Sequence, residues 1–130
     1  MNEPQVAVGA VVFRENRVLL VQRKNEPAAG QWAIPGGRVK QGETLKSAAE
    51  REVFEETGLR IKAGEPVYVL EYIDSVHYII IDLDAEYISG DPIPADDASD
   101  ARWVSSDELA ALHVTPSTLK LLKEKYDFIP

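Results

Sequence analysis

The sequence predicts an α/β fold in which helices flank a mixed β-sheet. Three features indicate this class: runs of β-branched residues lie before and after one central helical segment, a glycine- and proline-rich stretch precedes that segment, and a second helical pattern ends the chain. The 130 residues are 45% hydrophobic, which is enough for one packed core and hard to divide between two. We therefore expect one domain over residues 1–130.

The first third of the chain predicts a β-hairpin followed by an irregular segment. Val6–Phe13 and Val18–Arg23 are rich in β-branched residues, and the polar residues 15–17 between them are typical of a turn. Residues 25–42 contain two prolines and four glycines. This density predicts irregular structure, apart from a short extended piece at Trp32–Ile34.

The most regular element predicted is a helix over Thr44–Thr57. This segment has neither Gly nor Pro and is rich in Ala and Glu, which favour helices. Gly58 follows directly, at the position where glycine commonly ends a helix.

Strands are predicted again after this helix. Glu65–Ile73 and His77–Tyr87 are strand-like, and the second of them alternates in part and is rich in Ile. An acidic loop over Ser89–Asp100 leads to a short strand at Ala101–Val104. Ser105 or Ser106 is placed to cap a short helix, and residues 115–126 have helical spacing. The packing stripe expected in this last helix is Leu119, Leu122 and Tyr126.

The charge and cysteine content exclude several classes of function. Against 14 Lys and Arg stand 22 Asp and Glu, a formal charge of −8, which argues against binding nucleic acid or anionic membranes. The absence of cysteine excludes disulfides, thiolate zinc sites and cysteine nucleophiles, and it fits a reducing compartment. Val6–Phe13, the longest apolar run, is far shorter than the roughly 20 residues that span a membrane, and Met1–Pro4 lacks the basic start of a secretory signal. We expect a cytoplasmic protein with no nucleic-acid or membrane partner.

Three glutamates of the predicted helix lie on one face. At 100° per residue, Glu52, Glu55 and Glu56 share an arc of about 100° that continues an apolar stripe. Like charges at this spacing destabilise a helix by roughly 0.2–0.5 kcal/mol per pair. A hard divalent cation such as Mg²⁺ or Mn²⁺ would relieve the repulsion, because it prefers carboxylate and water oxygens. The alternative interpretation is a solvated acidic face.

Residues 37–59 resemble the Nudix box. That motif has nine specified positions and two fixed gaps: G, five residues, E, seven residues, then R-E-U-x-E-E-x-G-U, where U is a bulky aliphatic residue. All nine are present, as Gly37, Glu43, Arg51, Glu52, Val53, Glu55, Glu56, Gly58 and Leu59. The resemblance extends outward to Arg23, Trp32 and the strand of Trp103.

The resemblance to the Nudix family implies an α/β/α sandwich and a hydrolase that depends on Mg²⁺ or Mn²⁺. Glu52, Glu55 and Glu56 would be metal ligands, with the carbonyl of Gly37 as another. Water would attack one phosphorus of a diphosphate while the other phosphate leaves. The expected catalytic residues are Glu52 and a general base, either Glu55 or Asp97 of the acidic loop, with Asp100 as a further alternative.

The resemblance also suggests structural and substrate-binding residues. Arg51 would bind Glu43 and so tie the loop to the helix, and Gly58 would end the helix. The expected substrate contacts are Arg23, Arg38 and Trp32, although Trp32 could equally be a core residue. Trp103 is expected in the core, and His77 and His113 as structural or exposed residues.

The expected substrate is a small-molecule nucleotide, a nucleoside diphosphate linked to a further group. Residues 77–103 resemble small microbial family members that act on ADP-ribose or nucleoside triphosphates, and we favour ADP-ribose. The proline that marks many ADP-ribose hydrolases is absent at residues 74–75. The alternatives are a MutT-like nucleoside triphosphate pyrophosphatase, a noncatalytic nucleotide-sensing module and an acidic interaction domain. Homodimers are frequent in the family.

Overall fold

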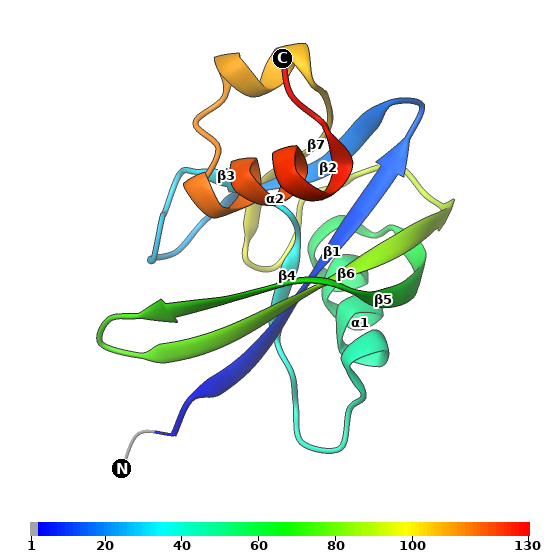
Figure 1. The fold of residues 1–130 in the computed structure, drawn as a ribbon. Coiled ribbons are helices and arrows are strands. Elements are labelled where there is room, and N and C mark those ends of the chain that lie inside the picture. The colour runs from blue at the N-terminus through cyan, green and yellow to red at the C-terminus, as the bar shows by residue number, and fades with distance from the viewer. Residues whose placement is uncertain (1–2) are drawn as a thin grey trace.

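The computed structural model describes residues 3–130, so Met1 and Asn2, at the start of the predicted domain, lie outside the described residues. Among the described residues, neither α-helix is long and apolar enough to cross a bilayer. The elements drawn in Figure 1 are β1 (Gln5–Arg14), β2 (Arg17–Arg23), β3 (Trp32–Ala33), β4 (Gly36–Arg38), α1 (Leu45–Thr57), β5 (Arg60–Ile73), β6 (His77–Ser89), β7 (Ala98–Ser105), the 3₁₀ helix η1 (Asp107–Ala111) and α2 (Pro116–Tyr126).

The strands form one mixed sheet. Its order is β3-β2-β1-β6-β5, with β4 paired to β1 and β7 paired to β2. β1 runs parallel to β6, and the other pairings are antiparallel. This mixture of directions confirms the predicted mixed sheet.

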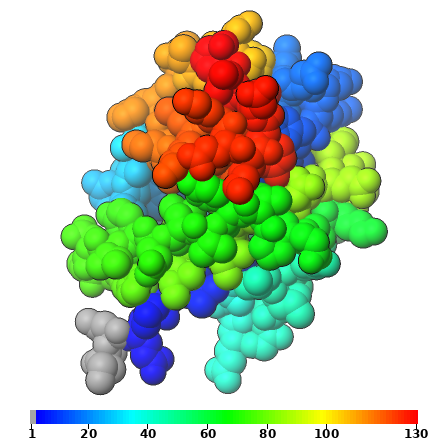
Figure 2. Space-filling model, viewed as in Figure 1, coloured from blue at the N-terminus to red at the C-terminus, as the bar shows by residue number. Residues whose placement is uncertain are grey.

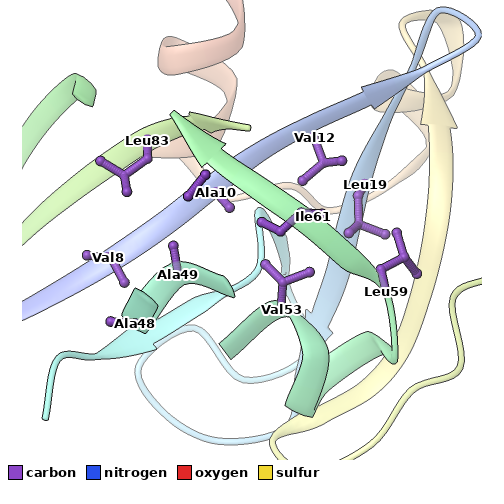
Figure 3. Close-up of a cluster of buried hydrophobic side chains, with 11 residues drawn as sticks. Val8, Ala10, Val12, Leu19, Ala48, Ala49, Val53, Leu59, Ile61 and Leu83 are labelled. Atoms are coloured by element: carbon purple, nitrogen blue, oxygen red, sulfur yellow. The ribbon is translucent and has the colours of Figure 1, made fainter. Parts of the chain in front are cut away.

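The two α-helices pack on opposite faces of this sheet. Val8, Ala10 and Val12 of β1 belong to a buried cluster with α1, shown in Figure 3. Val11 points to the other face, where it shares a second cluster with Leu121 of α2. In Figure 2 the β5–β6 hairpin crosses the front of the molecule, with α2 above it and the segment around α1 below it. The α/β/α sandwich is therefore confirmed.

Helix α1 begins and ends as the sequence predicts. The Thr44 side chain accepts a hydrogen bond from the Ser47 N–H, and the Ser47 side chain accepts one from the Thr44 N–H, which completes a capping box. Gly58 ends the helix in the left-handed conformation, at φ 76°, and its N–H donates to the Phe54 carbonyl. The two caps fix both ends of the helix that carries the three glutamates.

The expectation of irregular structure over residues 25–42 is wrong at β4. Gly36 and Gly37 pair with Gly9 and Val8 of β1. A Cβ on Gly36 would collide with the Val8 carbonyl oxygen, so only glycine lets the two backbones approach this closely. The same glycines that predict a loop here make a close strand contact.

The predicted packing stripe of the last helix is also partly wrong. Leu119 is 40% exposed, whereas Leu121 is 1% exposed and Thr118 is 4% exposed. The buried face of α2 includes Thr118, a polar residue that a search for an apolar stripe passes over. Thr118 can be buried because its hydroxyl accepts a hydrogen bond from the Thr115 hydroxyl at 2.7 Å.

Strand ends and the short helix differ in detail from the expectation. β5 begins at Arg60 rather than Glu65, and β7 begins at Ala98 rather than Ala101. The predicted short helix is the 3₁₀ helix η1. Its first turn is held by the Ser105 hydroxyl, which accepts the Glu108 N–H at 3.3 Å. Pairing with neighbouring strands decides where each strand begins and ends. The partners are distant in the sequence, so local sequence patterns do not reveal these ends.

Asp82 gives the fold a pH-dependent stability. It is 5% exposed on β6, opposite Gly9 and Tyr68 in the strand register, and burial raises its pKa to about 7. Above pH 4 the unfolded chain ionises this carboxyl while the folded chain keeps its proton, so stability is lost as the pH rises toward 7. Asp82→Asn removes this cost and should raise the free energy of unfolding by about 4 kcal/mol at pH 8.

The measurement is urea unfolding of both proteins between pH 4 and pH 8 in EDTA. The stability difference between Asp82→Asn and the unmodified protein should vanish near pH 4 and grow with pH. Asp91→Asn, at an exposed loop position, is the control and should leave the curve unchanged. A difference that is constant over the whole range would refute the assignment to Asp82.

Candidate active site

The carboxylates of α1 lie where the helix meets the sheet. Glu52 and Glu56 are 9% and 6% exposed, and the Glu55 side chain is 39% exposed. Their spacing places all three on one side of the helix, and the cluster of apolar residues around Val53 anchors that side to the sheet. The arrangement is one of two buried acids and one acid at the solvent edge.

Gly37 of β4 lies directly against Glu52. A Cβ on Gly37 would collide with both carboxylate oxygens and the carboxylate carbon of Glu52. The absence of a side chain therefore leaves room for the carboxylate beside the backbone of β4. The predicted glycine and glutamate of the site are brought together.

Arg51 joins the loop before α1 to the helix itself. Its Nε and Nη2 donate to the Glu43 carboxylate at 2.6 and 2.9 Å, and Nη2 also donates to the Arg38 carbonyl at 3.0 Å. The bond from Arg51 and the Lys40 N–H lower the pKa of Glu43 to about 2. Arg51 Nη1 donates to Glu55 at 2.9 Å. One guanidinium thus holds both the loop and an acid of the site.

Burial perturbs the two inner glutamates. It raises the pKa of Glu56 to about 8, and the charges of Glu52 and Asp97 add to this, against the Gly36 N–H, which donates to Glu56 at 3.2 Å, and the positive charge of Arg23. Burial also raises the pKa of Glu52, and the charge of Arg51 offsets part of the effect. Such buried acids in mutual repulsion are typical of a functional site.

The acidic loop between β6 and β7 is fixed to the end of α1. The Ile93 and Ala95 N–H groups donate to the Thr57 and Glu56 carbonyls at 2.9 and 3.0 Å. These bonds use carbonyls that the end of a helix leaves free. The helix and the loop, which together hold many of the chain's acids, therefore lie side by side.

Asp96 is the acid that this loop contributes to the cluster. Carboxylate oxygens of Glu52, Glu55 and Asp96 all lie within 4.8 Å of one another. Asp97 lies outside this group, and its Oδ1 accepts from Asn25 Nδ2 at 3.4 Å. The sequence analysis favoured Asp97 as the acid of this loop that takes part in the site. In the structure Asp96 adopts the left-handed conformation, φ 55°, which Asp tolerates better than most residues and which turns the chain at this point; no signal in the sequence separates it from Asp97.

The other predicted residues are distributed around the site. Arg23 lies at the end of β2, close enough to Glu56 to lower its pKa, and its Nε donates to the Pro27 carbonyl at 2.6 Å. Arg38 is exposed and donates to Gln5 Oε1 at 2.7 Å. Trp32 is 5% exposed in the second core cluster, and the Arg102 guanidinium lies 4.9 Å from its ring centre. Of these three, Arg23 is the one placed beside the acids.

The other tryptophan, the two histidines and Asp100 do not belong to the group formed by Glu52, Glu55 and Asp96. Trp103 packs against the cluster on the α1 face, with its ring 5.6 Å from that of Tyr87. His77 contacts Glu71 at 3.0 Å on the β5–β6 hairpin, and His113 is exposed. Asp100 accepts from Arg102 Nε at 3.2 Å and is likewise outside that group.

This donor set fits a hard divalent cation. The oxygens of Glu52, Glu55 and Asp96 converge, the Gly37 backbone lies against Glu52 with nothing between them, and no cysteine or histidine belongs to the group. Mg²⁺ and Mn²⁺ prefer such all-oxygen sites. Glu56 lies one helical turn from Glu52 and could supply a further oxygen.

Comparison with known proteins places the chain in one family. Residues 3–125 match the model of the NUDIX domain. The chain is 38% identical over 112 residues to the "ADP-ribose pyrophosphatase" of Methanocaldococcus jannaschii, which covers 84% of this chain and 66% of the relative. It is 28% identical over 124 residues to the "Oxidized purine nucleoside triphosphate hydrolase" of Mus musculus, covering 89% and 79% of the two chains.

Solved structures have the same fold. A MutT NUDIX hydrolase from Burkholderia pseudomallei matches with a TM-score of 0.85 and 30% identity, over 95% of this chain and 98% of that one. A bifunctional NMN adenylyltransferase/ADP ribose pyrophosphatase from Francisella tularensis, complexed with AMP and a Mn ion, matches with a TM-score of 0.80 and 26% identity, over 95% and 41%. The chain spans 66% of the length of its Methanocaldococcus relative.

Proposed function

We propose, from the premise that the chain belongs to the Nudix family, that it is a metal-dependent pyrophosphohydrolase acting on a nucleoside diphosphate linked to a further group. ADP-ribose is the substrate we favour. The proposal treats residues 1–130 as one catalytic domain that acts on a small nucleotide in the cytoplasm.

One observation carries the proposal. Glu52, Glu55 and Asp96 come from two separate segments, and their oxygens converge within 4.8 Å beside the glycine that leaves room for Glu52. A solvated acidic face, the alternative considered for the helix alone, would not be expected to bury Glu52 and Glu56. Burial of like charges is costly unless a cation is bound.

The residues that would hold the cation are Glu52, Glu55, Glu56, Asp96 and the carbonyl of Gly37. When bound, Mg²⁺ or Mn²⁺ would neutralise the charge of the diphosphate and lower the pKa of a bound water. Arg51 keeps these acids and the loop together through Glu43, so the donor set is preorganised before a ligand arrives.

The chain's own residues supply the remaining steps. Arg23 lies beside Glu56 and presents a guanidinium that can bind a phosphate oxygen. The attacking water must give up a proton, and we assign its acceptance to Glu55, the most exposed of the three glutamates. Asp97, bound to Asn25, is the second candidate for this step.

Support for ADP-ribose comes from two relatives. The Methanocaldococcus protein is named for this activity, and the Francisella structure combines that activity with AMP and a Mn ion. A nucleoside triphosphate is the second candidate substrate, because the Mus musculus relative hydrolyses oxidised purine nucleoside triphosphates and is matched over 79% of its length.

The deciding experiment is a substrate panel with Mg²⁺ or Mn²⁺, containing ADP-ribose, NADH, dinucleoside polyphosphates, and normal and oxidised nucleoside triphosphates. We expect ADP-ribose and water to give AMP and ribose 5-phosphate, with no product in EDTA. Release of pyrophosphate from a triphosphate, with ADP-ribose untouched, would favour the second candidate. Stabilisation by a nucleotide without any product would favour a noncatalytic sensor.

A further inference from the structure

Lys24 lies directly after β2 and contacts the acidic loop. Its Nζ donates to the Asp96 carbonyl at 2.9 Å, and its backbone N–H donates to the Asp97 carbonyl at 3.1 Å. The neighbouring Asn25 contacts the Asp97 side chain. Two segments more than 70 positions apart in the sequence are thus joined at the residue that completes the acid cluster.

Asp96 lies at a sharp turn of the backbone. It adopts φ 55°, in the left-handed region that residues other than glycine adopt infrequently, Asp more readily than most. On its N-terminal side, Ala95 is fixed by its N–H bond to the Glu56 carbonyl. On its C-terminal side the peptide carbonyls of Asp96 and Asp97 are held by Lys24. The turn is therefore restrained from both directions.

We propose that Lys24 is a positioning residue, whose ammonium group holds the Asp96 turn so that the Asp96 carboxylate meets Glu52 and Glu55. The proposal rests on the function proposed above. The Lys24 side chain is exposed and contacts a backbone carbonyl, so its role is to orient the loop. A charged donor makes a stronger hydrogen bond to a carbonyl than a neutral one, which suits this task.

A competing role would give a different result. Lys24 follows Arg23, so its ammonium could instead bind a substrate phosphate directly. That role would raise the KM for the substrate and would not depend on the Asp96 side chain. The positioning role acts only through Asp96, and it changes cation binding even when no nucleotide is present.

The test is a double-mutant cycle on the full chain. Lys24→Met and Asp96→Asn are made singly and together, and the Mn²⁺ dissociation constant is measured by calorimetry alongside kcat and KM. We expect Lys24→Met to weaken Mn²⁺ binding and to lower kcat, each about 3- to 10-fold, with KM little changed. In the Asp96→Asn background, Lys24→Met should have no further effect.

Two further variants complete the design. Lys24→Arg keeps a charged donor and should recover most of the Mn²⁺ affinity, and thermal unfolding in EDTA checks that each variant folds. Lys62→Met is the matched control, since Lys62 is an exposed lysine of β5 with no side-chain hydrogen bond or ion pair within residues 3–130. Equal losses from Lys24→Met in both backgrounds, or a loss seen only in KM, would overturn the proposal. Mn²⁺ binding without hydrolysis of any nucleotide would refute the proposed function and leave this comparison measurable.

Discussion

Replacing Glu56 with glutamine should lower metal-dependent turnover at least about a hundredfold while the protein still folds. The Gln side chain keeps the shape of Glu56 and can still accept the Gly36 N–H. With a pKa of about 8, Glu56 is mostly protonated at neutral pH when no cation is bound, so the neutral amide resembles the resident group. What the variant loses is the ability to become an anion opposite a cation.

Thermal unfolding with and without a divalent cation distinguishes an effect of Glu56→Gln on folding from an effect on cation binding. The thermal unfolding temperature in EDTA at pH 7 should rise for Glu56→Gln, because the unfolded chain ionises Glu56 at this pH while burial keeps it protonated in the folded chain. The stabilisation by added Mg²⁺ or Mn²⁺ should be strongly reduced. Glu55→Gln should show the same loss of turnover. Glu86→Gln, on an exposed part of β6, is the control and should behave like the unmodified protein. Unchanged turnover in both Glu55→Gln and Glu56→Gln would show that the site has been assigned wrongly.

The helix that carries these acids could be predicted because its signals are local. Its composition, its closing Gly58 and the 100° step between residues are all contained in one stretch of sequence. The face shared by Glu52, Glu55 and Glu56 follows from that step alone. The burial of Glu52 and Glu56 is consistent with their place on a face that continues an apolar stripe.

The parts that could not be predicted depend on contacts with distant segments. Gly36 and Gly37 read as a loop because glycine weakens a strand, yet β1 pairs with them and the absence of Cβ atoms permits the contact. The place of Asp96 in the cluster depends on Lys24 and on the carbonyls at the end of α1. No spacing within the acidic loop distinguishes Asp96 from Asp97.

The burial of Trp32 shows the same limit. A tryptophan beside a glycine-rich segment fits both a substrate contact and a core residue. The bridge to Val114 and the packing within the second cluster place Trp32 among core residues, and that contact comes from the far end of the chain.

The acidity of the sequence, which first argued against anionic partners, is concentrated where a cation would reverse that effect.

Replacing Gly37 with alanine should abolish cation binding at the acid cluster and lower turnover at least about a hundredfold. The added Cβ would collide with the Glu52 carboxylate, which is buried on α1. Glu52 must then rotate away from Gly37 and from the oxygens of Glu55 and Asp96. Most of the fold should survive, because Gly37 lies in the short strand β4, next to the loop before α1.

A second substitution tests whether the collision itself is the cause. Glu52→Asp shortens the side chain by one methylene and draws the carboxylate back, so the double variant Gly37→Ala/Glu52→Asp should bind Mn²⁺ better than Gly37→Ala alone. Gly64→Ala is the control glycine, since its added Cβ would meet Asp84, at 3.1 Å from the carbonyl oxygen and 3.9 Å from Cβ, and would meet no residue of the acid cluster. Mn²⁺ titration and steady-state kinetics measure both effects. Wild-type affinity and turnover in Gly37→Ala would mean that Glu52 does not use the space beside β4, and the metal site would then have to be built from other oxygens.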